Sequence, residues 1–380
     1  MDTNAMIILA CLSLVVWLLL RFCRGGFWRA DQCLCENGSL REWPSVIVII
    51  PARNEEQTIR DAVTSLARQD YPGLIHIVVV DDESSDNTLS IVRNWPNLHV
   101  VSGDALPKGW SGKLWAIQQG LNYCKVHLPV AKFILMTDAD IKHSSKNIRK
   151  LVFKAESESL HLVSLMVMLR TKSFWEKLLI PAFVFFFQKL YPFSWVNDPE
   201  KQTAAAAGGC ILIRRQTLEC VDTIKTVRDR LIDDCAIGKE IKSHGPIWLG
   251  ITNETHSLRA YQSFRDVANM VSRNAFRQLG YSGIALFLTI VGMVITYLVP
   301  PITLFYGVVS NHYILASTGA LTWIIMSLTY IPTLKFYDEK SWRVLWLPVT
   351  ALLYTLMTLS SALQYWQGRG SVWKSRMYKS

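Results

Sequence analysis

Residues 46–56 read VIVIIPARNEE, and residues 75–88 read IHIVVVDDESSDNT. In both stretches a β-branched apolar run ends abruptly in acidic and amide side chains. The runs are apolar at every position instead of every second one, which indicates strands of a sheet covered by helices on both faces. Helical patterns such as 55–68 and 112–123 separate further runs of this kind. These further runs lie at 98–102, 132–137, 161–167 and 209–213. The alternation predicts an α/β fold with a mostly parallel, Rossmann-like sheet.

Long apolar segments lie at both ends of the chain, in which half of the 380 residues are hydrophobic and only 18% are charged. The run 6–20 is followed by Arg21 and Arg24, which predicts a membrane anchor over 1–24 with the next domain in the cytoplasm. A signal peptide is the alternative, but no small-residue cleavage pattern follows. Three later segments are long enough to cross a bilayer and predict a multi-pass protein of the cell (inner) membrane. They lie within 283–366, at 284–308, 313–332 and 345–365.

The number of crossings is ambiguous. One N-terminal and three C-terminal crossings would place the basic tail, residues 367–380, outside the cell, against the tendency of basic residues to stay inside. Either one segment is re-entrant, with Pro300 and Pro301 as the break, or the first segment lies in the membrane interface.

The net charge of +10 does not indicate nucleic-acid binding. The basic residues are dispersed and many flank apolar segments, which suits an anionic lipid surface. No zinc-finger spacing or RNA-binding motif is present, so nucleic acid is not an expected partner. The eight cysteines form neither a metal spacing nor a disulfide framework, which favours a reduced, cytoplasmic setting for the middle of the chain.

An aromatic segment, residues 174–195, interrupts the alternation of strands and helices with FWEKLLIPAFVFFFQKLYPFSW. It is either a core helix or an element lying among lipid headgroups, and its Phe, Trp and Tyr content favours the interface. A basic juxtamembrane helix is predicted over 259–282.

Acidic residues crowd the end of the second strand, where ligands bind in α/β sheets. Asp86 can be explained as a helix cap, but the consecutive Asp81 and Asp82 cannot. A carboxylate at a strand tip can accept the imide N–H of a uracil ring, and Asp82 is the candidate for this contact. After the first strand, Asn54 and Glu55 either start a helix or belong to the same site.

Asp138 and Asp140 flank one small residue directly after the run FILMT. Mg²⁺ and Mn²⁺ are held by one or two carboxylates plus substrate phosphates, so this DxD pair suits a metal–diphosphate site. The same spacing occurs by chance in exposed loops. Its position at a strand end favours the metal site.

Asp233 and Asp234 precede a helical stretch at 235–243. They are either helix caps or a catalytic base that removes the proton of an attacking hydroxyl, for which Asp234 is the better candidate.

Lys113 stands at the start of a predicted helix, where it either binds a nucleotide or is a solvated surface lysine. Gly208 and Gly209 follow four alanines, and they let either a sugar or a packed segment approach closely. None of the eight histidines has a partner at metal-ligand spacing.

Taken in order, the motifs IIPARNEE, VVVDDESSDNT, GKLWA, TDAD, AAAAGGC and LIDDC resemble those of the inverting family-2 glycosyltransferases, which have a GT-A fold. The resemblance covers residues 44–280 and implies a GT-A nucleotide-diphospho-sugar transferase domain at 44–258. The stretch from Phe174 to Cys210 is similar to the hopene-associated glycosyltransferases of bacterial hopanoid biosynthesis.

The resemblance also implies roles for individual residues. Asp138 and Asp140 would hold a divalent metal ion, Mg²⁺ or Mn²⁺, and Asp234, with Asp233 beside it, would be the catalytic base. The candidates for binding the donor are Pro51, Arg53, Asn54, Glu55, Asp82, Lys113, Asp138, Gly208, Gly209, Arg273 and Arg277.

One departure from the superfamily concerns processive polysaccharide synthases, which carry a Q-x-x-R-W motif before their membrane helices. Residues 273–278 here read RNAFRQ, so polymer synthesis is not expected. Arg273 and Arg277 either contact the diphosphate or belong to an interfacial basic helix.

The resulting hypothesis is transfer of a sugar from a nucleotide-sugar donor, expected to be a UDP-sugar, to a lipid acceptor at the membrane with inversion of configuration. A nucleotidyltransferase or another nucleotide-sugar enzyme is the first alternative, because it can use the same metal motif. A catalytically inactive scaffold is the second.

Overall fold

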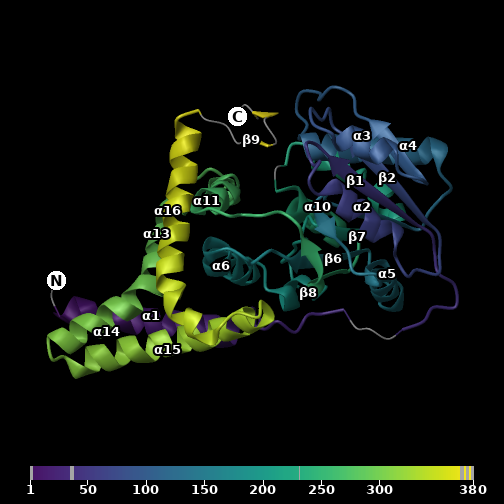
Figure 1. The fold of residues 1–380 in the computed structure, drawn as a ribbon. Helices are drawn as coiled ribbons and strands as arrows, with labels where there is room; N and C mark the ends of the chain where they lie inside the picture. The colour runs from purple at the N-terminus through teal and green to yellow at the C-terminus, as the bar shows by residue number, and fades with distance from the viewer. Residues whose placement is uncertain (1–2, 35–37, 231, 369–371, 374–375, 378–380) are drawn as a thin grey trace. The chain divides into compact units, whose positions relative to one another are not determined.

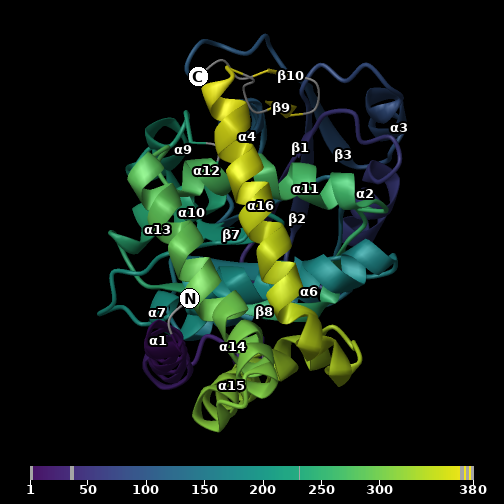
Figure 2. The ribbon, with the colours of Figure 1, turned by 90° about the vertical axis from the view of Figure 1, so that its left-hand side faces the viewer.

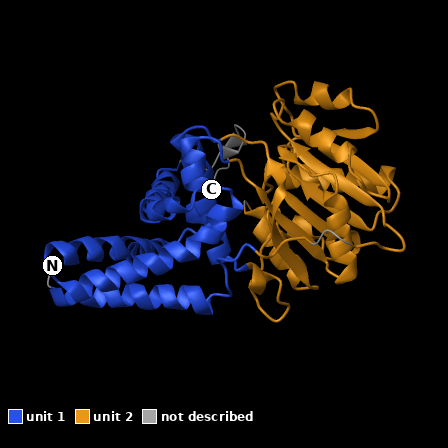
Figure 3. Ribbon diagram, turned by 60° about the horizontal axis from the view of Figure 1, so that its bottom comes forward, with its two compact units in different colours: residues 1–30, 171–192, 261–380 blue, residues 31–170, 193–260 orange. Residues whose placement is uncertain are grey.

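The computed structural model describes residues 3–34, 38–230, 232–368, 372–373 and 376–377. Arg369, Lys374 and Lys379 of the predicted basic tail lie outside these residues. The chain divides into two compact units, which Figure 3 colours separately. Unit 1 comprises residues 1–30, 171–192 and 261–380, and unit 2 comprises residues 31–170 and 193–260.

Unit 2 is built on an eight-stranded sheet with the order β3-β2-β1-β4-β7-β6-β8-β5 (Figure 1). The strands are β1 (Val46–Ala52), β2 (Ile75–Asp81), β3 (Leu98–Ser102), β4 (Phe133–Thr137), β5 (Ile141–Lys142), β6 (Leu162–Met168), β7 (Cys210–Arg214) and β8 (Ile247–Ser257). Four of the pairings are parallel, and the three that involve β7 or β5 are antiparallel. The sheet is therefore mixed, with parallel pairings in a small majority.

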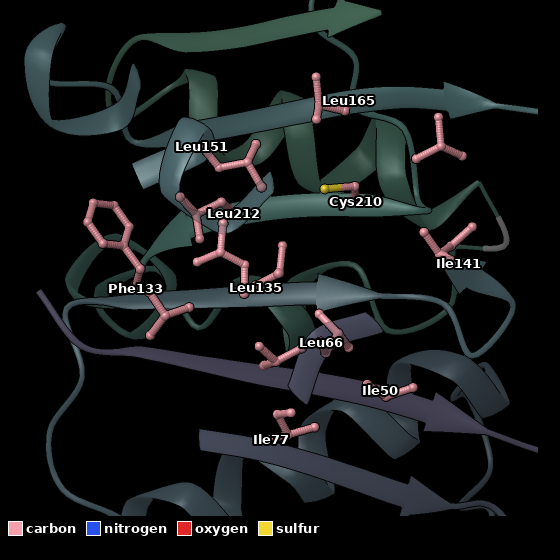
Figure 4. Packing of buried hydrophobic residues seen from close by; sticks show 14 of the residues in the cluster. Ile50, Leu66, Ile77, Phe133, Leu135, Ile141, Leu151, Leu165, Cys210 and Leu212 are labelled. Atoms are coloured by element: carbon pink, nitrogen blue, oxygen red, sulfur yellow. The ribbon is translucent and has the colours of Figure 1, made fainter. Parts of the chain in front are cut away.

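The helices of unit 2 cover both faces of the sheet, which explains why β1 is buried at every position. Val48 and Ile50 belong to the hydrophobic cluster formed with α2 (Ile59–Ala67) and α5 (Asn147–Ser157), part of which is drawn in Figure 4. On the other face, α4 (Gly112–His127) packs against β1 and β2. A Cβ added at Gly120 of α4 would lie 2.8 Å from Cγ2 of Ile49, so this helix touches the sheet directly.

The register of the parallel strands brings three strand ends to one edge of the sheet. Ala52 of β1 stands opposite Asp81 of β2, and Ile49 of β1 stands opposite Met136 of β4. The polar residues that follow β1, β2 and β4 therefore emerge at the same edge.

Unit 1 is helical, and four of its helices are long and apolar enough to cross a membrane. These are α1 (Thr3–Cys23), the continuous segment Gly283–Val309, α15 (Tyr313–Phe336) and the segment Ser341–Trp366, which contains α16 (Leu347–Trp366). The aromatic segment forms α6 (Phe174–Leu190), which packs within unit 1 against α15 and α16. The remaining helices are α11 (Phe264–Ser272) and α12 (Ala275–Gln278).

The segment Gly283–Val309 contains α13 (Gly283–Met293), a π-helical turn η1 (Val294–Leu298) and α14 (Val299–Val309). Figures 1 and 2 show that α13 runs beside α16, whereas α14 turns to run beside α1 and α15.

Two backbone carbonyls freed at this bend accept hydrogen bonds from α1. Pro300 has no N–H for the carbonyl of Thr296, and that carbonyl accepts a hydrogen bond of 2.6 Å from Nε1 of Trp17. The carbonyl of Ile295 accepts one of 2.7 Å from Oγ of Ser13. The bend is thus held by satisfied polar groups.

We expect Gly120→Ala to lower the free energy of unfolding by about 1–3 kcal/mol, because the new methyl group forces α4 away from the sheet. Urea unfolding of the purified protein in detergent measures the change. Gly292→Ala on α13 is the control, since its Cβ would meet nothing within 4 Å. An equal effect at both glycines would contradict the close packing inferred for Gly120.

Candidate functional site

The loops that follow β1 and β2 are bound to each other at the shared edge of the sheet. The guanidinium of Arg53 donates a hydrogen bond to the carbonyl of Asp82 and lies 3.7 Å from its carboxylate. The Asp82 side chain is fully buried, and its backbone N–H donates to the carbonyl of Ala52. Pro51 is buried in β1 opposite Val80.

Asn54 and Glu55 continue this connection between the two loops. Asn54 has a positive φ of 52°, and its side-chain oxygen accepts a hydrogen bond of 2.8 Å from the backbone of Ser85. The backbone N–H of Glu55 donates to Oγ1 of Thr88 at 2.7 Å. In the structure these two residues therefore link the loop after β1 to the loop after β2, at the same edge of the sheet.

The two aspartates of the DxD motif are each paired with a cation from another element. Oδ1 of Asp138 lies 2.7 Å from Nζ of Lys113, in the first turn of α4. Oδ2 of Asp140 lies 2.6 Å from Nε of Arg259, which follows β8. Arg259 also bridges to Glu55 at 2.9 Å, so it joins the loops after β1 and β4.

Asp233 and Asp234 lie in the first turn of α10 (Asp233–Lys242). Ile232 is the N-cap, so neither aspartate caps the helix. The carboxylate of Asp234 accepts hydrogen bonds from the N–H of Gly208 at 3.0 Å and of Cys235 at 2.8 Å. The carboxylate of Asp233 lies 3.6 Å from Nζ of Lys113, so this lysine connects the acid pair to Asp138.

The charged groups of this cluster shift the pKa values of their neighbours. Burial disfavours the ammonium of Lys113, but the carboxylates of Asp138 and Asp233 outweigh burial and raise its pKa. Burial, with the negative charge of Asp233, raises the pKa of Asp234 to about 6. Burial also raises the pKa of Asp138, although Lys113 opposes the shift.

Both predicted glycines border the cluster. A Cβ at Gly208 would lie 3.1 Å from Nζ of Lys113 and 3.4 Å from Oδ2 of Asp234, so the absence of a side chain lets these groups meet. A Cβ at Gly209 would press on Val167 and Ile141. The carbonyl of Gly209 accepts a hydrogen bond of 2.7 Å from Oγ1 of Thr137.

A buried histidine, His143, was not among the residues selected from the sequence. It lies next to Thr137, the residue directly before the DxD motif. The Nε2 atom of His143 lies 2.9 Å from Oγ1 of Thr137, and its Nδ1 atom lies 2.8 Å from the side-chain amide of Asn147. Burial lowers the pKa of His143 to about 3, so the ring is neutral. The imidazole ring of His143 therefore has a hydrogen-bond partner at each of its two nitrogens.

Arg259 is the second residue that sequence reasoning missed. The only available signal was a lone arginine after a strand whose second half is polar. The predicted Arg273 and Arg277 belong to unit 1, where Arg273 ends α11 and the guanidinium of Arg277 lies over the ring of Tyr281. Among the ion pairs of the described residues, none includes Arg273 or Arg277.

The donor atoms of the DxD motif suit a hard divalent cation. The structure groups no three His, Cys, Asp or Glu side chains as a metal cluster within the residues it describes. Asp138 and Asp140 supply two carboxylates, and Mg²⁺ or Mn²⁺ takes its remaining oxygen ligands from substrate phosphates and water. The residues therefore fit a metal that binds together with a diphosphate.

Residues 47–222, most of which lie in unit 2, match the family described as Glycosyl transferase family 2. A mannosyltransferase from Pyrobaculum calidifontis, in complex with GDP-Man and Mn²⁺, shares the fold with a TM-score of 0.56 and 16% identity. The comparison covers 96% of this chain and 99% of that one. Residues 47–222 thus match a family 2 glycosyltransferase domain, and the chain has the GT-A fold.

Two curated relatives are similar over part of the chain. The 4,4'-diaponeurosporenoate glycosyltransferase of Staphylococcus haemolyticus (strain JCSC1435) is 30% identical over 112 residues, which are 29% of this chain and 28% of that protein. Its namesake from Staphylococcus aureus (strain bovine RF122 / ET3-1) is 24% identical over 238 residues, or 62% and 58% of the two chains. The chain spans less than two thirds of the length of these relatives.

Lys113→Gln should lower the free energy of unfolding at pH 8 by about 2 kcal/mol, because it leaves neighbouring carboxylates unneutralised in a partly buried place. Without the ammonium the pKa values of Asp138 and Asp234 rise further in the folded protein. Protonation then favours the folded variant as the pH falls, so the deficit should shrink towards pH 5.

Thermal or urea unfolding of wild type and variant at both pH values measures this difference. Lys132→Gln is the matched control, because it breaks an exposed ion pair with Glu156 at the opposite end of β4. A deficit of equal size at pH 8 and pH 5 would argue against an acid cluster neutralised by Lys113.

Proposed function

We propose that this enzyme transfers a sugar from a nucleotide-sugar donor to a lipid acceptor at the membrane, with inversion of configuration. The observation that carries the proposal is the position of Lys113, between the DxD aspartate Asp138 and the acid pair Asp233–Asp234. One ammonium group thus connects the residues suited to the donor diphosphate with the residues suited to activating the acceptor.

The donor would lie over the ends of β1, β2 and β4. A UDP-sugar is the proposed donor, with the Asp82 carboxylate accepting the imide N–H of uracil. Asp82 is fully buried beside Arg53, so the Arg53 side chain would have to move for this contact to form. The solved relative in complex with GDP-Man supports a nucleotide sugar in general. Pro51, Asn54 and Glu55 would line the same site.

A divalent metal ion, Mg²⁺ or Mn²⁺, would be held by Asp138 and Asp140. When bound, such an ion offsets the negative charge that develops on the leaving nucleoside diphosphate. The presence of Mn²⁺ in the similar mannosyltransferase supports this assignment.

Asp234 is the proposed catalytic base. Its two backbone hydrogen bonds fix the carboxylate, and its pKa of about 6 leaves it ionised at neutral pH while keeping it a useful proton acceptor. It would take the proton of the acceptor hydroxyl as that oxygen attacks the anomeric carbon in line with the leaving diphosphate. A single displacement of this kind inverts the configuration.

A lipid acceptor is supported by the four helices of unit 1 that are long and apolar enough to cross a membrane. The staphylococcal relatives are named for diaponeurosporenoate, a lipid-like carotenoid. The resemblance of residues 174–210 to hopene-associated enzymes makes a hopanoid-related acceptor our narrower proposal. Catalysis would take place on the cytoplasmic side of the cell (inner) membrane.

The proposal is tested by incubating the purified full chain in lipid with Mn²⁺ and a panel of nucleotide sugars labelled in the sugar. Mass spectrometry should detect one added sugar unit on a lipid, and hopanoid and carotenoid acceptors can be offered side by side. A lipid that gains the nucleotide instead would favour a nucleotidyltransferase and overturn the proposal.

Asp234→Asn should reduce transfer by at least about 10³-fold, because the amide cannot accept the hydroxyl proton. Binding of UDP, measured by calorimetry, should stay within a few-fold of wild type. Asp222→Asn is the control, since this exposed aspartate pairs only with Lys225 among the ion pairs described. Undiminished turnover in Asp234→Asn would remove it from the role of base.

A further inference from the structure

Both carboxylates assigned to the metal are already paired with side-chain cations. Lys113 reaches Asp138 at 2.7 Å, and Arg259 reaches Asp140 at 2.6 Å. The two cations come from distant parts of unit 2 in the sequence, from α4 and from the segment after β8. The backbone secures the second pair, because the N–H of Leu258 donates to the carbonyl of Asp140 at 2.7 Å.

Each cation also has a second acidic partner nearby. Lys113 lies 3.6 Å from Asp233, and Arg259 lies 2.9 Å from Glu55. A cation that leaves its DxD aspartate therefore keeps a compensating charge. The side chains of Lys113 and Arg259 are 22% and 37% exposed, so an incoming anion can reach both.

A divalent cation placed on the same carboxylates would stand close to two positive side chains. Charges of like sign within a few ångströms repel each other strongly in a partly buried site. A diphosphate removes this conflict, because its oxygens can pair with lysine and arginine while they also ligate the metal.

We propose that Lys113 and Arg259 act as resident cations, which pair with Asp138 and Asp140 until a nucleoside diphosphate attracts the two cations away from the aspartates. Binding of the nucleotide then strengthens binding of the metal, and binding of the metal strengthens binding of the nucleotide. This inference rests on the proposed function, which assigns the metal to these aspartates. Each resident cation thus weakens binding of the metal alone and strengthens binding of the nucleotide alone.

The consequence for Arg259 has a definite sign. If Arg259 competes with the metal, its removal should tighten binding of Mn²⁺ to the nucleotide-free protein and weaken binding of UDP in the absence of metal. If Arg259 only braces the loops, its removal should loosen Asp140 and weaken binding of Mn²⁺.

The experiment measures binding of Mn²⁺ to the full chain in detergent by the electron paramagnetic resonance of free Mn²⁺, with and without saturating UDP. Arg259→Gln should bind Mn²⁺ alone about tenfold more tightly than wild type, since the competing partner of a largely buried carboxylate is gone. Its gain in Mn²⁺ affinity on adding UDP should shrink by a similar factor. Arg259→Lys keeps the charge and should stay near wild type.

Lys132→Gln is the matched control, because it removes one paired lysine at the other end of β4 and should leave Mn²⁺ binding unchanged. Unchanged or weaker binding of Mn²⁺ by Arg259→Gln, with UDP still bound, would overturn the inference and leave the proposed function intact. A wild-type protein that binds no Mn²⁺ even with saturating UDP would instead refute the metal assignment, and the inference with it.

Discussion

The ammonium group of Lys113 is the interaction on which the site depends. It lies between Asp138 and Asp233, with Asp234 adjacent, and these acids come from two segments about a hundred residues apart. Carboxylates gathered in a partly buried place repel one another and tend to become protonated. A single cation among them allows ionised carboxylates on the loop after β4 and at the start of α10 to lie close together.

Small residues make this arrangement possible. A Cβ at Gly238 of α10 would lie 2.8 Å from the carbonyl carbon of Ala205, so the helix packs directly on the alanine-rich segment. That close packing lets the carboxylate of Asp234 reach the N–H of Gly208. The run of alanines and glycines therefore allows close packing of α10 and also positions the proposed base. A packing role and a role at the site, the two alternatives for these residues, are compatible.

Much of unit 2 could be predicted from the sequence, for physical reasons that particular residues illustrate. The strands β1, β2 and β4 are apolar over most of their length because helices cover both faces of the sheet, and such runs are easily recognised. A uniformly apolar run does not indicate the direction in which a strand crosses the sheet, so β7 could not be recognised as antiparallel. The strand β8 was missed because its second half, residues 252–257, is polar, and Arg259 after it was missed for the same reason.

His143 illustrates a different limit. Its partners Thr137 and Asn147 are six and four residues away, and neither is a metal ligand or an acid. A search for chemical motifs passes over such a residue, because hydrogen bonding to neutral groups leaves no recognisable spacing. Strand ends singled out Asp82, Asp138 and Asp140 as candidates, and the start of a helix singled out Asp234. Their contacts with Arg53, Arg259 and Gly208 follow only from the fold.

The bend at η1 changes how the apolar segment Gly283–Val309 can be counted in a membrane topology. Each straight part, α13 and α14, has 11 residues and therefore rises about 16 Å, which is roughly half the hydrocarbon thickness. Because the two parts run along different axes, their lengths do not add into one straight traverse. A hydropathy plot counts this segment as one membrane crossing. An even or odd number of crossings taken from such a plot therefore does not fix the side of the membrane on which the residues after this segment lie.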